Sequence, residues 1–359
     1  MRRRTIVLLA ALAVAGASHA QTESMTPALK QLAAAASKEG ELFIKWSAGT
    51  FGGPQGAKQL EANINAAYGT KIQIKWAPGG DMPSLGNEIA IAQRNNQPAG
   101  SDVYVGFSRN MAVFGKHDLF QKGDYRQYSP DRMSAAIVER DTYVKVYSAT
   151  IGLTYNKARA PSVPERLTDL LKPEWKGKVG TTPFAAGFEQ IAAKEAWGPA
   201  KTLEFAKAFS QQIAGFMLCQ EADRVASGEF VAFAMDCGGG NMTRAARKGA
   251  PLVRVLAPEV PIVSYFYLAV PKNATHPNAA KLFITYVLSM KGQRETYEFA
   301  HSDVHLLPGS QTAKEIQATE QRYGIKYRSA DIAWQETAND AGNEAQRQVE
   351  KILQEGRRR

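Results

Sequence analysis

The apolar and polar positions of this chain repeatedly switch between a strand pattern and a helix pattern. Residues 41–46 (ELFIKW) predict a strand, and Ala57, Leu60, Ile64 and Ala67 then recur at helical spacing. Residues 71–76 alternate at period two, and residues 101–107 predict a third strand that leads into a short helix. This repetition indicates an open, mostly parallel α/β sheet.

Two long β-rich runs interrupt the alternation, over residues 143–156 and 260–272. Between them lies a second alternating region, with strands expected over 178–183, 214–219 and 229–237. We therefore predict two α/β lobes, two open and mostly parallel sheets, joined by two crossing strands with a cleft between the lobes. The predicted boundaries are 21–145 plus 265–359 for lobe 1 and 146–264 for lobe 2.

The first residues, 1–20, have the order of a secretory signal peptide. A basic start is followed by an apolar core and by small residues that end at Ala20. The core is too short for stable membrane insertion, so we expect an exported, periplasmic protein. A chain of 359 residues without this segment still exceeds what one hydrophobic core usually serves, in agreement with two lobes.

The formal net charge of +10 favours anionic partners only weakly. We expect no nucleic-acid partner, because the basic residues form no concentrated patch and the terminal Arg357–Arg359 run is typical of a solvated tail. No nucleophile elbow, phosphate-binding Walker motif or complete zinc set is present, so the sequence does not indicate an enzyme. His301, Asp303 and His305 have a spacing that suggests a metal, but they lie in a connecting segment, and we expect no metal or other cofactor there.

Four loops that follow predicted strands combine glycine with hydroxyl or amide side chains, over 46–53, 107–110, 180–188 and 236–249. Glycine permits close backbone approach, and a helix N-terminus offers unpaired N–H groups to an anion. Each loop taken alone is more typical of ordinary helix capping, and only the four together favour a ligand site. Arg109 either pairs with an acidic ligand group or lies on the surface, whereas Arg244 and Arg247 are expected to face solvent.

Alternation along residues 264–268 (SYFYL) places Tyr265 and Tyr267 on one face and Phe266 on the other. The two tyrosines either line the cleft beside a crossing strand or pack as ordinary core residues.

Four segments resemble the periplasmic solute-binding proteins of bacterial ABC importers, in the branch that contains the ferric-iron-binding proteins. They are LKQLAAAASKEGELFIKWSAG near the start, PERLTDLLKPEWKGKVGTTP, ADRVASGEFVAFAMD and LAVPKNATHPNAAKLFITYVLSMKGQRE. The resemblance implies the type II two-lobed fold, a monomer that closes on a small solute, and delivery to a permease with its ATPase. It implies a binding protein with no enzymatic activity.

Under this resemblance the four loops and the returning strand are expected to meet at one interlobe site. The candidate ligand-binding residues are Trp46, Ser47, Thr50, Phe51, Gly52, Gly53, Ser108, Arg109, Thr182, Phe184, Asp236, Gly239, Gly240, Asn241, Tyr265 and Tyr267. Their glycines, hydroxyls and Arg109 favour an anionic or zwitterionic solute: a phosphonate, a phosphate ester or a carboxylate.

Two other ligand classes stay open. Ferric iron is the first alternative. Iron-binding relatives carry adjacent tyrosines after the strand that matches FVAFAMD, but this chain has Cys237-Gly238-Gly239-Gly240 there, so iron is not the preferred ligand. A polyamine or other organic cation is the second; it would need carboxylates, and Asp236 is the acidic residue found in these loops.

The chain has two cysteines, Cys219 and Cys237, which in an oxidising compartment form either a disulfide or two separate buried thiols. If the resemblance holds and the strands before them are neighbours, both sulfurs lie at the ligand edge. The expected bridge would then close a loop of about 19 residues and hold the base of the glycine loop.

Overall fold

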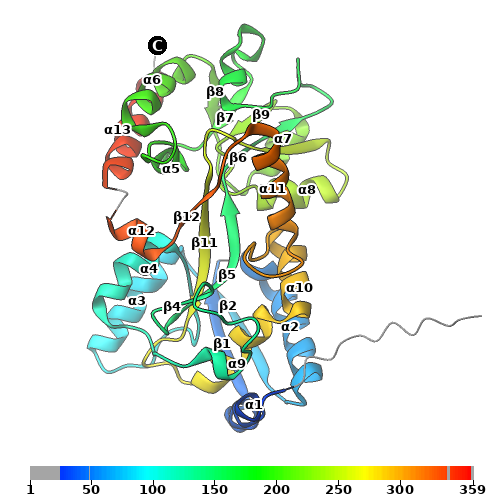
Figure 1. The fold of residues 1–359 in the computed structure, drawn as a ribbon, viewed down its shortest axis with the longest axis vertical. Helices are drawn as coiled ribbons and strands as arrows, with labels where there is room; N and C mark the ends of the chain where they lie inside the picture. Colours follow the sequence, from blue (N-terminus) through cyan, green and yellow to red (C-terminus); the bar gives the residue numbers. More distant parts are fainter. Residues whose placement is uncertain (1–24, 48, 338–339, 357–359) are drawn as a thin grey trace, which may run out of the picture.

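The computed structural model describes residues 25–47, 49–337 and 340–356, arranged as two lobes one above the other (Figure 1). The predicted signal peptide lies outside these residues. Within the described part of the chain, no helix is long and apolar enough to cross a membrane. The two-lobed α/β architecture predicted from the periodicity is confirmed.

The first lobe, at the bottom of Figure 1, is built around a large apolar core. Its elements before the crossing are α1 (Pro27–Glu39), β1 (Glu41–Trp46), η1 (Thr50–Gly52), α2 (Gly53–Tyr68), β2 (Gln73–Pro78), α3 (Met82–Arg94), β3 (Tyr104–Phe107), α4 (Ser108–Phe114), η2 (Gly115–His117), η3 (Tyr125–Gln127) and β4 (Val138–Glu139). After the return, α9 (Pro277–Leu288) and α10 (Met290–Ala300) complete it.

The second lobe has its own core and a five-stranded sheet in the order β10-β6-β9-β7-β8. Its elements are β6 (Gly152–Asn156), η4 (Leu167–Leu171), η5 (Pro173–Trp175), β7 (Val179–Thr181), α5 (Phe188–Ile191), α6 (Gly198–Ser210), β8 (Ile213–Phe216), α7 (Ala222–Ser227), β9 (Ala232–Ala234), α8 (Gly240–Arg247) and β10 (Leu252–Leu256). β7 pairs in parallel with both β8 and β9, whereas β6 pairs antiparallel with both β9 and β10. The sheet is therefore mixed and not mostly parallel as predicted, because the chain enters this lobe through β6 and leaves it through β10 at one edge.

Two long strands connect the lobes, as the β-rich runs predict. β5 (Tyr143–Thr150) rises into β6, and β11 (Ile262–Ala269) returns beside it (Figure 1). They pair antiparallel from Val263↔Thr150 to Leu268↔Val144, and β3 pairs with the other edge of β11. The crossing is therefore a continuous sheet and not two separate linkers.

The last elements do not stay with the first lobe, where the sequence places residues 265–359. They are α11 (Gln311–Tyr323), β12 (Arg328–Ala330), α12 (Ile332–Thr337) and α13 (Asp340–Gly356). α12 packs on α4 of the first lobe, but α13 packs on α5 and α6 of the second. Val349 and Leu353 are buried in the second lobe's core, and this burial is the physical reason for the difference.

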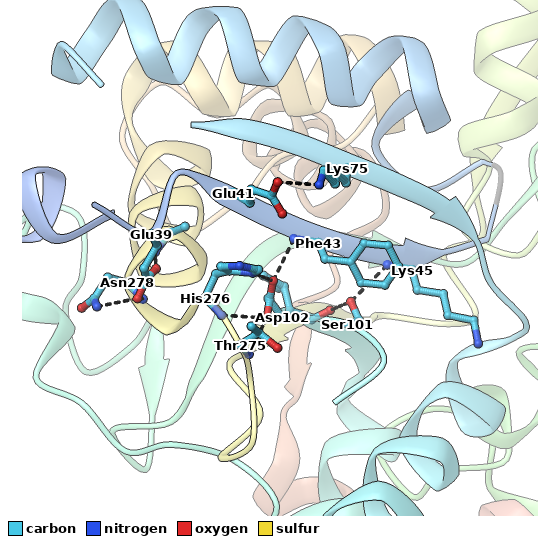
Figure 2. A network of polar contacts seen from close by, with 12 residues as sticks. Glu39, Glu41, Phe43, Lys45, Lys75, Ser101, Asp102, Thr275, His276 and Asn278 are labelled. Carbon is cyan, nitrogen blue, oxygen red and sulfur yellow. Dashed lines mark hydrogen bonds and ion pairs between the residues drawn. The ribbon is translucent and has the colours of Figure 1, made fainter. Parts of the chain in front are cut away.

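A buried carboxylate joins three segments of the first lobe (Figure 2). Asp102, just before β3, accepts hydrogen bonds from the backbone N–H of Phe43 on β1 at 2.8 Å and of Thr275 at 2.8 Å. It also accepts from the backbone N–H of His276 at 3.0 Å, and lies 2.8 Å from His276 Nδ1. The carboxylate thus links β1 to the segment before β3 and to the turn before α9.

We predict that Asp102→Ala lowers the free energy of unfolding by about 2–4 kcal/mol, because several buried donors lose their acceptor. Urea denaturation followed by circular dichroism measures the effect. Asp131→Ala, at an exposed position of the same lobe, is the matched control and should change little. Equal stability of the two variants would contradict this role of Asp102.

Candidate functional site

A cavity of about 1630 Å³ lies between the lobes, and both lobes and the crossing strands line it. Of the predicted candidates, it brings together those at the ends of β1, β3, β7 and β9. The candidates that line it are Ser47, Thr50, Phe51, Ser108, Arg109, Phe184, Gly240 and Asn241. Whether they contact a ligand remains a prediction.

The first lobe contributes the turn after β1. Ser47 Oγ lies 2.8 Å from Thr50 Oγ1, so the two hydroxyls form one polar edge of the cavity. Phe51 has φ 47°, a left-handed conformation that is uncommon for a residue other than glycine. Phe51 lies in the turn that connects β1 to α2, and this turn lines the cavity.

The second lobe contributes the loop between β9 and α8. Cys237, Gly238 and Gly239 all have positive φ values, of 54°, 85° and 72°. A Cβ at Gly239 would lie 1.7 Å from Arg254 Nε, so a side chain there would displace that guanidinium. Asn241 then donates from Nδ2 to the backbone oxygen of Cys219 at 3.0 Å, which ties the start of α8 to the loop after β8.

The disulfide between Cys219 and Cys237 is present, with a Cα–Cα distance of 5.8 Å, and both cysteines line the cavity. The strands before them are not neighbours, however, because β7 lies between β8 and β9. The bridge therefore spans the end of an intervening strand to hold the two loops together.

Asp236 is a structural residue of the same loop in this structure. It is 2% exposed and accepts from Arg254 Nε at 2.7 Å, from Gly152 N at 3.1 Å and from Thr154 Oγ1 at 3.0 Å. Arg254 also donates to the backbone oxygen of Thr150 at 2.6 Å. Through these bonds the Asp236 carboxylate anchors the loop to the crossing strand. Asp236 does not line the cavity.

The remaining candidates do not line the cavity either. Trp46 donates from Nε1 to Val103 O at 2.9 Å, and Thr182 Oγ1 accepts from Ala186 N at 2.8 Å, as a local cap. Tyr265 and Tyr267 are fully buried. The candidates outside the lining are Trp46, Gly52, Gly53, Thr182, Asp236, Gly239, Tyr265 and Tyr267.

Several cavity residues were not among the candidates. Arg244, expected to face solvent, is partly buried, lines the cavity and donates from Nη2 to Phe299 O at 2.8 Å. This bond joins α8 of the second lobe to α10 of the first, a contact that no local pattern could reveal. Glu189 on α5 and Asp81, which caps α3, are the acidic residues of the lining.

The charges of the two lobes act on each other across the cleft. Burial raises the pKa of Glu189 in the second lobe, and the positive charge of Arg109 in the first lobe opposes this shift. Burial also raises the pKa of the Tyr147 hydroxyl, against the opposing charge of Arg244. One arginine from each lobe thus influences the same cavity.

Asp303 and His305, from the segment with metal-like spacing, make structural contacts. Asp303 accepts from Gln311 N at 2.9 Å and Thr312 N at 3.1 Å and so caps α11. His305 Nδ1 lies 2.8 Å from Ser148 Oγ on β5. Among the residues that the structure describes, no three His, Cys, Asp or Glu side chains are grouped to hold a metal ion.

The chain matches the bacterial extracellular solute-binding proteins over residues 59–323. It belongs to that family. The resemblance drawn from the four sequence segments is thereby confirmed. A comparison with curated proteins gives no significant match.

Solved structures share the fold at low sequence identity. The substrate-binding protein of an ABC transporter from Agrobacterium tumefaciens has a TM-score of 0.69 at 15% identity, over 92% of this chain and 98% of that one. AfuA from Actinobacillus pleuropneumoniae, with fructose-6-phosphate bound, has 0.59 at 18%, over 88% and 97%. Iron-bound HitA from Pseudomonas aeruginosa has 0.59 at 17%, over 88% and 99%. These similarities show the fold alone.

We predict that replacing both cysteines, Cys219→Ser with Cys237→Ser, lowers the free energy of unfolding by about 3 kcal/mol, because the unfolded chain regains the freedom of a loop of about 19 residues. Urea denaturation with and without dithiothreitol measures it. The reductant should destabilise the wild type and leave the double variant unchanged; an equal response of both proteins would be inconsistent with a stabilising bridge.

Proposed function

We propose that this protein is the periplasmic substrate-binding component of an ABC importer, and that it captures a small anionic or zwitterionic solute in the interlobe cavity. The solute carries a phosphonate, phosphate ester or carboxylate group. The liganded protein delivers it to a membrane permease, which an ATPase drives. The role is one of binding and release without catalysis.

The observation that carries this proposal is the pair of arginines that enter one cavity from opposite lobes. Arg109 stands at the start of α4, and Arg244 lies on α8. A guanidinium can bind a carboxylate or phosphonate in bidentate geometry, which gives both energy and orientation. In the same lining, Ser47, Thr50 and Asn241 offer polar groups that can donate to further oxygens.

Lobe closure is the mechanism that this arrangement supports. The cavity is larger than a typical small-molecule pocket of about 300–1,000 Å³. An anion that contacts both arginines interacts more strongly when the lobes approach, so its binding shifts the population toward a closed form. The paired crossing strands are the part of the chain that can flex as this happens.

The two alternatives make different demands on the cavity. Ferric iron prefers hard anionic ligands such as tyrosine oxygens, but Tyr265 and Tyr267 are buried, and the Tyr265 hydroxyl already lies 2.6 Å from Ser329 Oγ. A polyamine prefers carboxylates, and Asp81 and Glu189 share the lining with arginines. Both alternatives are therefore less well supported than an anion.

A thermal-shift screen distinguishes the three ligand classes. Phosphonates, phosphate esters, carboxylates, amino acids, polyamines and ferric iron are added singly, since a ligand that binds the folded state raises its apparent stability. An upward shift with acidic solutes is expected. A shift with polyamines alone, or a visible charge-transfer colour with iron, would replace the proposal by the corresponding alternative.

We predict that Arg109→Ala and Arg244→Ala each weaken binding of the best acidic hit at least tenfold, because each removes one charge that faces the anion. Isothermal titration calorimetry gives the dissociation constants. Arg247→Ala is the matched control, because Arg247 lies on the same helix but is exposed, with its guanidinium 4.9 Å from the Tyr297 ring centre. An unchanged dissociation constant in Arg109→Ala would remove that residue from the site.

A further inference from the structure

Three neighbouring strands, β3, β11 and β5, each contribute an aromatic side chain to the cavity lining. Phe107 is the one residue of β3 that is not buried, and Phe266 is the one residue of β11 that is not buried. In β5 only Tyr147 and Ala149 are partly exposed. All four line the cavity together with Ser148 and Ser264, so three of the six residues that these strands contribute to the lining are aromatic.

The register of the sheet places these rings in one row. Phe266 is the direct partner of Phe107 on one side and of Tyr147 on the other. The ring centres of Phe107 and Phe266 are 3.7 Å apart, and those of Tyr147 and Phe266 are 4.1 Å apart and stacked. Phe51, also in the lining, meets Tyr147 edge-on at 6.0 Å. We call Phe107, Phe266 and Tyr147 the aromatic row.

The opposite face of β11 shows that this exposure is a property of one face only. Tyr265 and Tyr267 flank Phe266 and are completely buried. Apolar ring surface that is left in contact with water is unfavourable, and a ligand that covers it gains the corresponding free energy. A flat ring gains more than an aliphatic group, because it can stack on or meet edge-on the rings already present.

The two arginines of the cavity lie close to this row. Arg109 follows Phe107 by two residues, and both side chains line the cavity. The charge of Arg244 acts on the hydroxyl group of Tyr147, at the other end of the row. A ligand ring that rests on the row therefore has a guanidinium within reach of an acidic substituent.

We propose that the solute is an aromatic acid, a planar ring that carries a carboxylate or phosphonate, with its ring on the aromatic row and its acidic group between Arg109 and Arg244. This inference rests on the proposed function and narrows its ligand class. An aromatic row can also hold an organic cation, but the guanidinium groups of Arg109 and Arg244 in the same cavity repel a positive charge.

Calorimetric titration of the wild type with two matched pairs of probes tests the inference. Phenylphosphonate is compared with methylphosphonate, and benzoate with acetate, so that each pair shares the acid and differs in the ring. The ring-bearing member should bind at least tenfold more tightly in each pair. Equal affinities within the pairs would overturn the aromatic inference and leave the anion proposal intact. Failure of all four probes to bind would count against both.

Substitutions in the row locate the preference. Phe266→Leu keeps an apolar side chain and removes the ring, so the preference for phenylphosphonate over methylphosphonate should fall by at least fivefold. Phe43→Leu, at a partly buried position of β1 outside the cavity lining, is the matched control and should retain it. Loss in both variants, or in neither, would overturn the assignment to the row.

A second position guards against a folding defect in Phe266→Leu. Tyr147→Phe keeps the ring and should retain the preference, whereas Tyr147→Leu should reduce it. Thermal unfolding of each variant shows whether it is folded under the conditions of the titration. Retention of the full preference in a folded Tyr147→Leu variant would contradict a role for Tyr147 in the row.

Discussion

The antiparallel pairing of β5 with β11 is the interaction on which the rest of the structure depends. Backbone hydrogen bonds of this ladder join the two lobes, and β3 extends the same sheet into the first lobe. On β11, Tyr265 and Tyr267 are buried in the core of the first lobe, whereas Phe266 between them lines the cavity. Because side chains alternate across a strand, the same ladder decides which aromatic residues pack in the core and which line the cavity.

The second lobe shapes its part of the cavity through a few well-satisfied polar contacts. The loop after β9 turns through several left-handed residues, a conformation that most side chains disfavour. Its stability comes from the buried Asp236–Arg254 pair and from the disulfide to Cys219. A buried charge pair is tolerated when its remaining hydrogen bonds are filled, and here Gly152, Thr154 and Thr150 fill them. The loop is thus fastened to the crossing strands.

The fold itself leaves the solute open. Related structures of nearly the same extent hold fructose-6-phosphate in one case and iron in another, at identities below 20% to this chain. Chemical selectivity must therefore come from side chains that the scaffold positions. In this protein the cavity is lined by arginines from both lobes, small polar groups at strand ends, and aromatic rings on the connecting sheet.

The sequence by itself determined the α/β alternation, the two crossing runs and several cavity residues, because these follow from local periodicity and from the rule that strand ends meet at one edge. Alternation even separated Phe266 from Tyr265 and Tyr267. Only the tertiary structure decided that the Phe266 face of β11 lines the cavity and that the Tyr265 and Tyr267 face is buried, since this depends on which elements pack against each face. The same holds for Asp236, whose partner Arg254 is distant in sequence, and for Arg244, whose position follows from the contact between α8 and α10. Long-range packing leaves no periodic trace in a single chain, and for that reason the full lining of the cavity is seen only in the folded protein.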